Sequence, residues 1–368
     1  MNVLFQSRTN LFTVPGGDTV QVVKTKEYLS KLGVNVDIST DLEPNLKGYD
    51  IVHLFNLMRP QDVLIQARNA KMQNKKIVLS TIYGTYNEYD RFARTGISRF
   101  ISNLLPVSVI EYLKIVARTI TNREVHRGVL MYLTNGHIKS LNDIVSMVDV
   151  FLPNSESEMK RVQSDFKLYC NKKFVIVPNA VDINCFDLGI TGVPDDLIKY
   201  KDCVLCVARI EGRKSQLNLI KAMKSLPYKL VLIGKPAPNH HKYYDQVKRE
   251  ASDNVYFEGQ IDHDLLAQYY KLAKVHALIS WMETPGLSSI EAAVMECNIV
   301  VTEKGDTRDY FANYAYYCDP SDIDSIRDAI IRAYDAPINP ELRQHILSNF
   351  TWELSAKATL EGYQHALS

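Results

Sequence analysis

A short basic stretch near the middle of the chain combines three cationic side chains with the expected start of a helix. Residues 208–215 read ARIEGRKS, with Arg209 and Lys214 following the apolar run CVLCV. Backbone N–H groups at a helix N-terminus are unpaired and favour an anion, and arginine and lysine add charge and hydrogen-bond donors for phosphate oxygens. The stretch therefore predicts a phosphate-binding loop, with a solvated basic turn as the alternative.

A second stretch, residues 280–291, places two carboxylates around another expected helix start. It reads SWMETPGLSSIE, with Glu283 before the helix and Glu291 within its first turns. Carboxylate oxygens accept paired hydrogen bonds from vicinal hydroxyls, such as those of a ribose or a sugar ring. Gly286 permits a tight turn and a close approach of the backbone to a ligand. The alternatives are a Glu283 favoured only by the helix dipole and a Glu291 on a solvated helix face.

Both stretches follow apolar runs, and such runs alternate with helical patterns along the chain. This order predicts doubly wound parallel sheets, whose strands are apolar throughout because helices cover both faces. Ligands of such sheets bind at the carboxyl ends of the strands, where both stretches lie. The expected strands are residues 3–5, 34–38, 50–55, 76–80, 148–155 and 174–179 in the first half, and 203–207, 229–234, 254–259, 275–280, 298–303 and 315–319 in the second.

A looser stretch rich in Gly, Asp and Pro, INCFDLGITGVPDD, separates the two runs of strands. The strand–helix pattern restarts after it, so we take this stretch as the linker between two domains. We expect domains over residues 1–185 and 186–350, followed by a closing helix over 351–368.

The overall composition excludes several classes of protein. The chain has 368 residues, of which 46% are hydrophobic and 23% charged, and a disordered chain would be far less apolar. Its 43 Lys and Arg against 42 Asp and Glu give a net charge of +1, so no basic excess indicates a nucleic-acid partner. Six cysteines are too sparse for a disulfide scaffold, and no apolar run approaches the ~20 residues that span a bilayer. The N-terminus lacks the pattern of a secretory signal, so we expect a cytoplasmic protein.

Five segments of the chain, in order, resemble motifs of the retaining glycosyltransferases of family four, which have the GT-B fold. The acidic stretch has the family's Glu-x7-Glu spacing as ETPGLSSIE, preceded by ARIEGRK. VPNAVDINCF resembles the Pro-Asn-Gly-Val-Asp segment, KGDTRDYF the Gly-Gly-x-x-Glu loop, and NFTWELSAKATLEGY the closing helix. VYFEGQIDHDLLAQYYKLAKVHALIS resembles the strand, helix and strand before the glutamate motif. The resemblance implies an α/β protein with two Rossmann-like, doubly wound domains facing across a cleft.

The resemblance implies catalytic and donor-binding roles for four charged residues. Arg209 and Lys214 are expected to neutralise the diphosphate of a nucleotide-sugar donor. Glu291 is expected to hold the ribose hydroxyls, and Glu283 to contact the donor sugar near its reacting face. Breaking a glycosyl–phosphate bond puts negative charge on the leaving diphosphate, which fixed cations and helix dipoles stabilise. Such a site needs no bound metal.

The resemblance also implies that backbone groups bind the donor at two places. The backbone at Gly286 and Leu287 is expected to meet sugar and phosphate. Gly16 and Gly17, in the first loop of the chain, are expected to approach the phosphates from the other domain.

Three residues of the first half are candidates to orient the sugar or the acceptor. Tyr83 stands where the family usually carries a histidine, and its hydroxyl can hydrogen-bond a sugar but is a poor proton acceptor near neutral pH. His53 and Asn56 end an apolar strand and are candidates to line the acceptor side of the cleft. The alternatives are a packing role for Tyr83 and a structural histidine at position 53.

Two attractive signals are discounted. Asp262-His263-Asp264 is a D-x-D sequence, the metal signature of a different glycosyltransferase fold, but its place before an apolar helix favours Asp262 as a helix N-cap. Cys203 and Cys206 lie three apart in an expected strand, face opposite sides and belong to the core. We expect no metal ion, and no cofactor besides the substrate nucleotide-sugar.

Residues 96–122 interleave apolar and basic side chains, as GISRFISNLLPVSVIEYLKIVARTITN. This composition suits an amphipathic element that lies in a membrane interface. The alternative is a set of helices packed on the first sheet.

These observations and the resemblance together predict a metal-independent, retaining hexosyltransferase (EC 2.4 class). Its donor is a nucleotide-diphosphate sugar, with a UDP-sugar favoured over a GDP-sugar, bound by the second domain. The first domain binds the acceptor, a glycan or lipid-linked glycan, and the closing helix packs back on it. The expected setting is synthesis of bacterial surface polysaccharide, such as O-antigen, capsule or exopolysaccharide, at the inner face of the cytoplasmic membrane. The alternatives are a sugar-nucleotide epimerase of similar fold and a catalytically idle partner subunit of a transferase.

Overall fold

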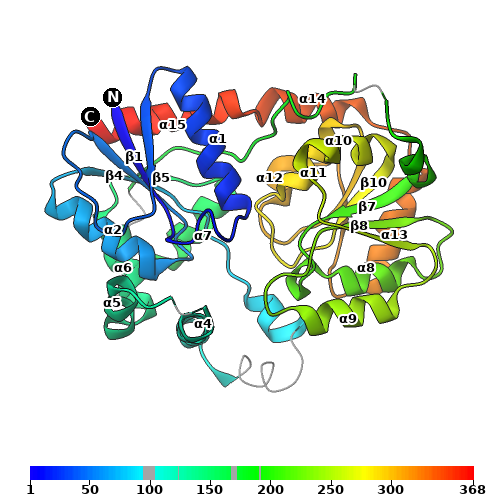
Figure 1. Cartoon of the computed structure of the whole chain (residues 1–368), viewed down its shortest axis with the longest axis horizontal. Helices are drawn as coiled ribbons and strands as arrows, with labels where there is room; N and C mark the ends of the chain where they lie inside the picture. The colour runs from blue at the N-terminus through cyan, green and yellow to red at the C-terminus, as the bar shows by residue number, and fades with distance from the viewer. Residues whose placement is uncertain (94–103, 123, 167–171, 190–191) are drawn as a thin grey trace. The chain divides into compact units, whose positions relative to one another are not determined.

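The computed structural model of the chain describes residues 1–93, 104–122, 124–166, 172–189 and 192–368. These residues form two compact units, each with its own parallel sheet (Figure 1). The N-terminal unit takes the described residues up to Thr85, those from 104 to 179, and Trp352–Ser368. The C-terminal unit takes Ala180–Thr351 and a short segment that starts at Tyr86. The units interleave along the chain. The predicted domains were residues 1–185 and 186–350, with a closing helix over 351–368.

The sheet of the N-terminal unit has six parallel strands in the order β2-β1-β3-β4-β5-β6. The direction in which the strands are added reverses between β1 and β3, which makes this the topological switch point of the sheet. The loops that follow β1 and β3 lie together at its carboxyl edge, where such sheets bind ligands. Every residue of β3 is buried, as expected for a strand covered on both faces. The strands are β1 (Asn2–Gln6), β2 (Asn35–Ser39), β3 (Ile51–Phe55), β4 (Lys76–Ser80), β5 (Val150–Leu152) and β6 (Lys173–Phe174).

Two groups of helices cover this sheet. Helix α1 packs against α15, and α2 packs against α5 and α6, with the strands between the two groups (Figure 1). Helix α1 ends before Gly33, whose φ of +80° lies in the left-handed region that terminates a helix. The helices are α1 (Gly17–Lys31), α2 (Pro60–Met72), α4 (Val107–Asn122), α5 (Arg127–Asn135), α6 (His137–Met147), α7 (Glu156–Asp165) and α15 (Trp352–Leu367).

The sheet of the C-terminal unit also has six parallel strands, in the order β12-β11-β10-β7-β8-β9. Its switch point lies between β7 and β10, which are neighbours in the sheet but far apart in the sequence. Two doubly wound parallel sheets confirm the predicted α/β fold class. The strands are β7 (Cys203–Val207), β8 (Leu230–Ile233), β9 (Val255–Gly259), β10 (Ala273–Leu278), β11 (Asn298–Thr302) and β12 (Tyr316–Cys318).

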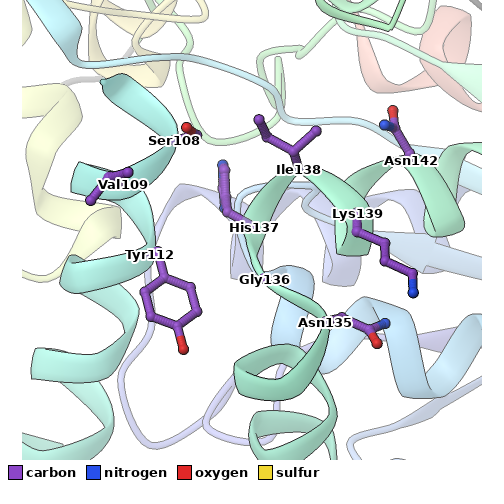
Figure 2. A pocket seen from close by; sticks show the side chains of 9 residues that line it. All are labelled: Ser108, Val109, Tyr112, Asn135, Gly136, His137, Ile138, Lys139 and Asn142. Carbon is purple, nitrogen blue, oxygen red and sulfur yellow. The ribbon is translucent and has the colours of Figure 1, made fainter. Parts of the chain in front are cut away.

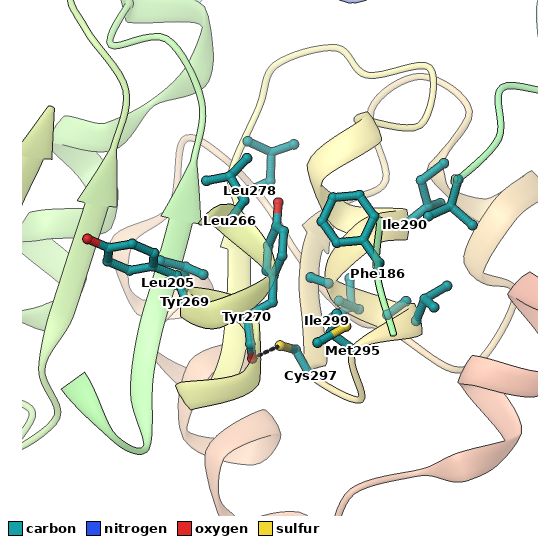
Figure 3. Close-up of a cluster of buried hydrophobic side chains, with 14 of the residues drawn as sticks. Phe186, Leu205, Leu266, Tyr269, Tyr270, Leu278, Ile290, Met295, Cys297 and Ile299 are labelled. Carbon is teal, nitrogen blue, oxygen red and sulfur yellow. Dashed lines mark hydrogen bonds between the residues drawn. The ribbon is translucent and has the colours of Figure 1, made fainter. Parts of the chain in front are cut away.

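Separate apolar clusters fill the two sides of the C-terminal sheet. One contains Cys203 and the other Cys206, which confirms that both cysteines are core residues on opposite faces of β7. Figure 3 shows part of the cluster with Cys203, where the Cys297 thiol donates to the carbonyl oxygen of Tyr270 at 3.2 Å. The helices of this unit are α8 (Gln216–Met223), α9 (His241–Glu250), α10 (His263–Leu272), α11 (Leu287–Val294), α12 (Thr307–Phe311), α13 (Ile323–Asp335) and α14 (Pro340–Asn349), with shorter turns η1 (Tyr89–Ala93), η3 (Asp195–Tyr200) and η4 (Gly212–Lys214).

Candidate functional site

The two charged stretches of the sequence meet at the switch point of the C-terminal sheet. Residues 208–215 follow β7 and residues 279–286 follow β10, and these strands pair in parallel. The backbone N–H of Trp281 donates to the carbonyl of Arg213 at 2.9 Å, which ties the two loops together. The order of the strands therefore places the cationic side chains of residues 208–215 next to the Glu283 carboxylate of residues 279–286.

Lys214 and Glu283 form an ion pair between these loops, although they are 69 positions apart in the sequence. Lys214 ends η4, and Glu283 is only 8% exposed. The backbone of Glu283 is fixed on both sides, because its N–H donates to Lys304 at 3.2 Å and its carbonyl accepts from the Asp306 N–H at 2.8 Å. The pair sets an ammonium suited to phosphate beside a carboxylate suited to hydroxyl groups.

The loop after β7 carries two arginines, Arg209 and Arg213, whose surroundings differ. Arg213 donates to the Glu211 carboxylate at 2.6 Å and to the Tyr86 hydroxyl at 2.9 Å. Burial alone would raise the pKa of Glu211, but the charge and hydrogen bond of Arg213, with the charge of Arg209, hold it below its ordinary value. Within the described part of the chain, the Arg209 guanidinium has no hydrogen-bond or ion-pair partner. Arg209 is therefore the arginine of this loop with donors to offer an anion.

Gly286 lies at the N-terminus of α11 with a φ of +85°, in the left-handed region that favours glycine. A Cβ at this position would lie 2.6 Å from Cδ2 of Leu278 and 3.3 Å from Oε2 of Glu283. Glycine thus lets the turn pack against the Glu283 carboxylate. Leu287 begins α11 directly after it, so the first N–H groups of this helix are available to an anion near Glu283.

Glu291, in α11, is held by two side chains of α10. Its Oε2 accepts from the Tyr270 hydroxyl at 3.0 Å, and its Oε1 lies 3.1 Å from Nε2 of His263. Tyr270 stands in the core (Figure 3), and burial and the charge of Glu291 raise the pKa of its hydroxyl, which therefore remains a donor. The Glu291 carboxylate is thus held in one orientation, with its remaining lone pairs available to ligand hydroxyls.

Gly16, Gly17 and Asn56 lie at the switch point of the N-terminal sheet, after β1 and β3. The Arg8 guanidinium stabilises the loop after β1 by donating two hydrogen bonds, of 2.7 and 3.0 Å, to the Asp18 carboxylate. Burial alone would raise the pKa of Asp18, but the hydrogen bonds and charge of Arg8, with a hydrogen bond from Asn56, lower it. The structure therefore brings the predicted glycines and Asn56 to one edge of the sheet. Their contacts with donor and acceptor stay predictions.

His53 is buried within β3 and does not line a surface. Its Nδ1 lies 2.7 Å from the Tyr363 hydroxyl and its Nε2 lies 2.9 Å from the Ser80 hydroxyl. Burial lowers the pKa of His53 to about 3, so the ring is neutral. These contacts favour the structural histidine over a residue that touches the acceptor.

Tyr83 is 6% exposed and packs its ring against Phe166. Its hydroxyl donates to Asp165 at 2.6 Å, and its backbone N–H donates to Glu158 at 2.6 Å. Burial and the Asp165 carboxylate raise the pKa of the hydroxyl. Because the protein already engages both polar groups, the structure favours the packing role over the sugar-orienting role.

The segment that starts at Tyr86 belongs to the C-terminal unit and was not predicted to contribute to the site. The Tyr86 hydroxyl accepts a hydrogen bond from the Arg213 guanidinium. The Glu88 carboxylate forms an ion pair with the Lys304 ammonium at 2.5 Å, in the loop after β11. The Tyr89 ring of this segment also lies 6.4 Å, centroid to centroid, from the Trp281 ring, so the segment contacts both loops of the candidate site. No sequence signal indicated this, because the segment lies among the strands of the first half.

Residues 96–103 of the predicted amphipathic segment lie outside the described residues, and its remainder contains α4. One side of α4 exposes Val109, Leu113 and Ile120 at helical spacing, while Ile115 is buried. The amphipathic pattern is therefore present on α4, and its contact with a membrane stays a prediction. Among the residues that the structure describes, no helix is both long enough and apolar enough to cross a bilayer.

A pocket of about 550 Å³ opens between α4 and α6 in the N-terminal unit (Figure 2). Burial lowers the pKa of His137, which lines it. The lining combines apolar, hydroxyl, amide and ammonium groups, which suit an amphipathic ligand. The lining residues are Ser108, Val109, Tyr112, Asn135, Gly136, His137, Ile138, Lys139 and Asn142.

Comparison with known proteins agrees with this arrangement. Residues 196–349 match the family described as glycosyl transferases group 1. Over 243 residues the chain is 26% identical to the D-inositol 3-phosphate glycosyltransferase of Mycolicibacterium smegmatis, a match that takes in 61% of this chain and 55% of that protein. The chain therefore matches little more than half the length of that curated relative.

Two solved structures share the fold over nearly the whole chain. Sucrose-phosphate synthase from Thermosynechococcus elongatus superposes with a TM-score of 0.70 at 16% identity, covering 99% of this chain and 98% of that one. HepE of Anabaena, solved with UDP and glucose, superposes with a TM-score of 0.68 at 13% identity, covering 99% of each chain. The domain match supports the predicted transferase enzyme. Residues 196–349 thus match the glycosyl transferases group 1 family, in a chain that shares the two-domain α/β GT-B fold of these solved structures.

Proposed function

We propose that the chain is a metal-independent, retaining glycosyltransferase that uses a nucleotide-diphosphate sugar. The observation that carries this proposal is the Lys214–Glu283 ion pair beside the unpaired Arg209 guanidinium, at the switch point of a glycosyl transferases group 1 domain. In this proposal Arg209 and Lys214 bind the diphosphate. Glu291 receives the ribose hydroxyls, and Glu283 contacts the donor sugar.

The proposed chemistry uses these groups to stabilise the leaving diphosphate. The bond between the anomeric carbon and the phosphate oxygen breaks, and its electron pair stays on the diphosphate. Arg209, Lys214 and the N-terminus of α11 oppose the charge that develops there. The acceptor hydroxyl oxygen forms the new glycosidic bond as its proton passes to the leaving diphosphate oxygen, with the donor's anomeric configuration retained.

In this proposal a UDP-sugar is favoured over a GDP-sugar as the donor. The similarity to the HepE structure, which was solved with UDP, supports this preference. The acceptor is a glycan or lipid-linked glycan of a bacterial surface polysaccharide, such as O-antigen or other lipopolysaccharide, capsule or exopolysaccharide. The apolar side of α4 and the neighbouring pocket support an acceptor with an apolar part. They also support a cytoplasmic enzyme held peripherally on the inner face of the cytoplasmic membrane.

Product analysis with the full chain tests the proposal. UDP- and GDP-sugars are each incubated without acceptor, with lipid-linked glycans, and with small sugar or inositol phosphates. Nucleoside diphosphate is measured by chromatography, and the anomeric configuration of the product by proton NMR. We expect release from a UDP-sugar that depends on a glycan acceptor, does not require added Mg²⁺, and retains configuration.

The rival functions give different products. An epimerase would convert or release the sugar without any acceptor, and an idle partner subunit would release nothing with any pair. Transfer only to a small sugar phosphate or inositol phosphate would support glycosyltransferase activity but refute a role in polysaccharide synthesis. An inverted product would refute retention.

A further inference from the structure

Three side chains with different ligand chemistry converge beside α10 in the C-terminal unit. Cys185, in the loop before η3, meets His263 and Asp264 from the first turn of α10. One ligand atom from each of the three lies within 4.8 Å of the other two. Tetrahedral zinc sites hold their ligand atoms about 3.5 Å apart. Because His263 and Asp264 are exposed and Cys185 is half-buried, small side-chain rotations can close this difference.

The core beneath these residues holds both segments in place. Phe186, next to Cys185, is 2% exposed and lies in the buried cluster of Figure 3. Its ring meets the His263 ring edge-on, with centroids 5.2 Å apart, and the Tyr270 ring at 5.7 Å. The loop that carries Cys185 and the helix that carries His263 therefore pack through one aromatic contact. Their ligand groups cannot drift apart without disturbing this contact.

A second, independent observation concerns the other side of the His263 ring. Nε2 of His263 lies 3.1 Å from Oε1 of Glu291, whose Oε2 is held by the Tyr270 hydroxyl. Histidines that bind metal commonly donate their second ring N–H to a carboxylate, which fixes the tautomer and orients the ring. In the tautomer that donates from Nε2 to Glu291, Nδ1 is the ring nitrogen that carries the lone pair.

The nature of the three donors selects the metal. Thiolate, imidazole and carboxylate together suit Zn²⁺ better than Mg²⁺ or Ca²⁺, which prefer oxygen ligands alone. Cys185 is also the described cysteine that is not fully buried. Burial raises the pKa of Cys203, Cys206 and Cys318 to about 12, which keeps those thiols protonated.

We propose that Cys185, His263 and Asp264 form a Zn²⁺ site in which water fills the fourth position and Glu291 orients His263. This site differs from the D-x-D sequence discounted above, because Asp262 takes no part in it. Asp262 occupies the N-cap position of α10, as expected, without a side-chain capping hydrogen bond. The proposal does not rest on the proposed function, since metal binding is measured without any nucleotide.

Titration of the chelator-treated full chain with Co²⁺, as a spectroscopic substitute for Zn²⁺, tests the site. We expect one Co²⁺ per chain, with a thiolate-to-metal charge-transfer band, visible bands of a four-coordinate ion, and loss of both on adding one equivalent of Zn²⁺. C185S should abolish the charge-transfer band. E291Q should weaken binding about 10- to 100-fold, as is usual when the carboxylate partner of a metal-bound histidine is removed. D262N is the matched control and should leave the affinity unchanged.

A second measurement needs no variant and covers the case in which C185S fails to fold. Iodoacetamide alkylation of the native chain is followed by mass spectrometry, with and without Zn²⁺. Zn²⁺ should protect Cys185 at stoichiometric metal. Alkylation of Cys185 that Zn²⁺ does not slow, or a charge-transfer band that survives in a folded C185S chain, would overturn the proposal. Loss of binding in D262N equal to that in D264N would overturn the assignment of Asp264.

Discussion

Lys214 and Arg209 differ in what they already bind, and this makes their substitution informative. Lys214 pairs with Glu283, while Arg209 has no side-chain partner among the described residues. Lys214→Ala and Arg209→Ala should each lower kcat by about 10²–10³, because each removes ~3–4 kcal/mol of stabilisation from the developing phosphate charge. Lys201→Ala removes an exposed cation of the same unit and should leave turnover unchanged. Near-normal turnover of both site variants at saturating donor would refute the diphosphate assignment.

The two glutamates should separate nucleotide binding from turnover. Glu291→Gln should weaken binding of UDP alone, because the proposed function assigns Glu291 to the ribose. Glu283→Gln should spare UDP binding and depress kcat, because Glu283 is assigned to the reacting sugar. Calorimetric titration with UDP and initial rates with the donor measure the two effects. Equal losses of UDP affinity in both variants would show that the two roles are not distinct.

The buried His53 predicts how stability changes with pH. Its pKa is about 3 in the folded chain against 6.5 ordinarily, because burial disfavours the charged ring. Between these values the unfolded chain binds the extra proton, so the contribution of His53 to the free energy of unfolding falls as pH falls, by at most ~1.4 kcal/mol per pH unit. His53→Gln should reduce the slope of stability against pH in urea unfolding between pH ~7 and ~5, and the slope that remains includes the equally buried His276.

His241→Gln is the matched control, since it makes the same substitution at an exposed position. If His53→Gln and the wild-type chain lose stability equally as the pH falls, the protonation of His53 does not limit the folded state in acid.

Helix α4 is the element with a testable surface role. Its exposed Leu113 and Ile120 lie on one side, and burying either in a lipid interface is worth ~1.5–3 kcal/mol. The double variant Leu113→Ser, Ile120→Ser should therefore weaken binding to phosphatidylglycerol vesicles by at least ~10-fold. Co-sedimentation measures binding, and circular dichroism checks that the helix content is kept.

Met72→Ser is the control for this surface. Met72 ends α2, is 70% exposed and should not affect vesicle binding if α4 makes the contact. Vesicle binding that is absent in the wild-type chain, or unchanged in the double variant, would leave α4 without a membrane role.

The whole molecule consists of two units with separate cores, and the proposed nucleotide site lies in one of them. UDP at about 100 times its Kd should stabilise the C-terminal unit by ~2.7 kcal/mol, which slows exchange through unfolding of that unit about 100-fold. Hydrogen exchange followed by mass spectrometry should show this in β7 and β10, with little change in β1 and β3. Equal protection of both sheets would mean that the units unfold together, and protection of β1 and β3 alone would move the nucleotide to the other unit.

The fold and the position of the candidate site could be predicted from the sequence because both rest on local patterns. Apolar runs alternating with amphipathic helices specify doubly wound parallel sheets, and every such sheet exposes the loops after its strands at one edge. The loops that hold Arg209, Lys214 and Glu283, and the helix start that carries Glu291, therefore fell after strand ends in the sequence and lie there in the structure.

Whether each polar side chain is free or already paired could not be predicted, because partners come from distant parts of the chain. His53 meets Tyr363 across 310 positions, and Tyr83 meets Asp165 across 82. The segment from Tyr86 joins the C-terminal unit, and Cys185 becomes the neighbour of His263, through the same kind of long-range packing. The period of apolar residues records which side of an element faces the core. It carries no record of which two elements meet there, and that pairing sets the burial, the hydrogen bonds and the charge of every candidate residue.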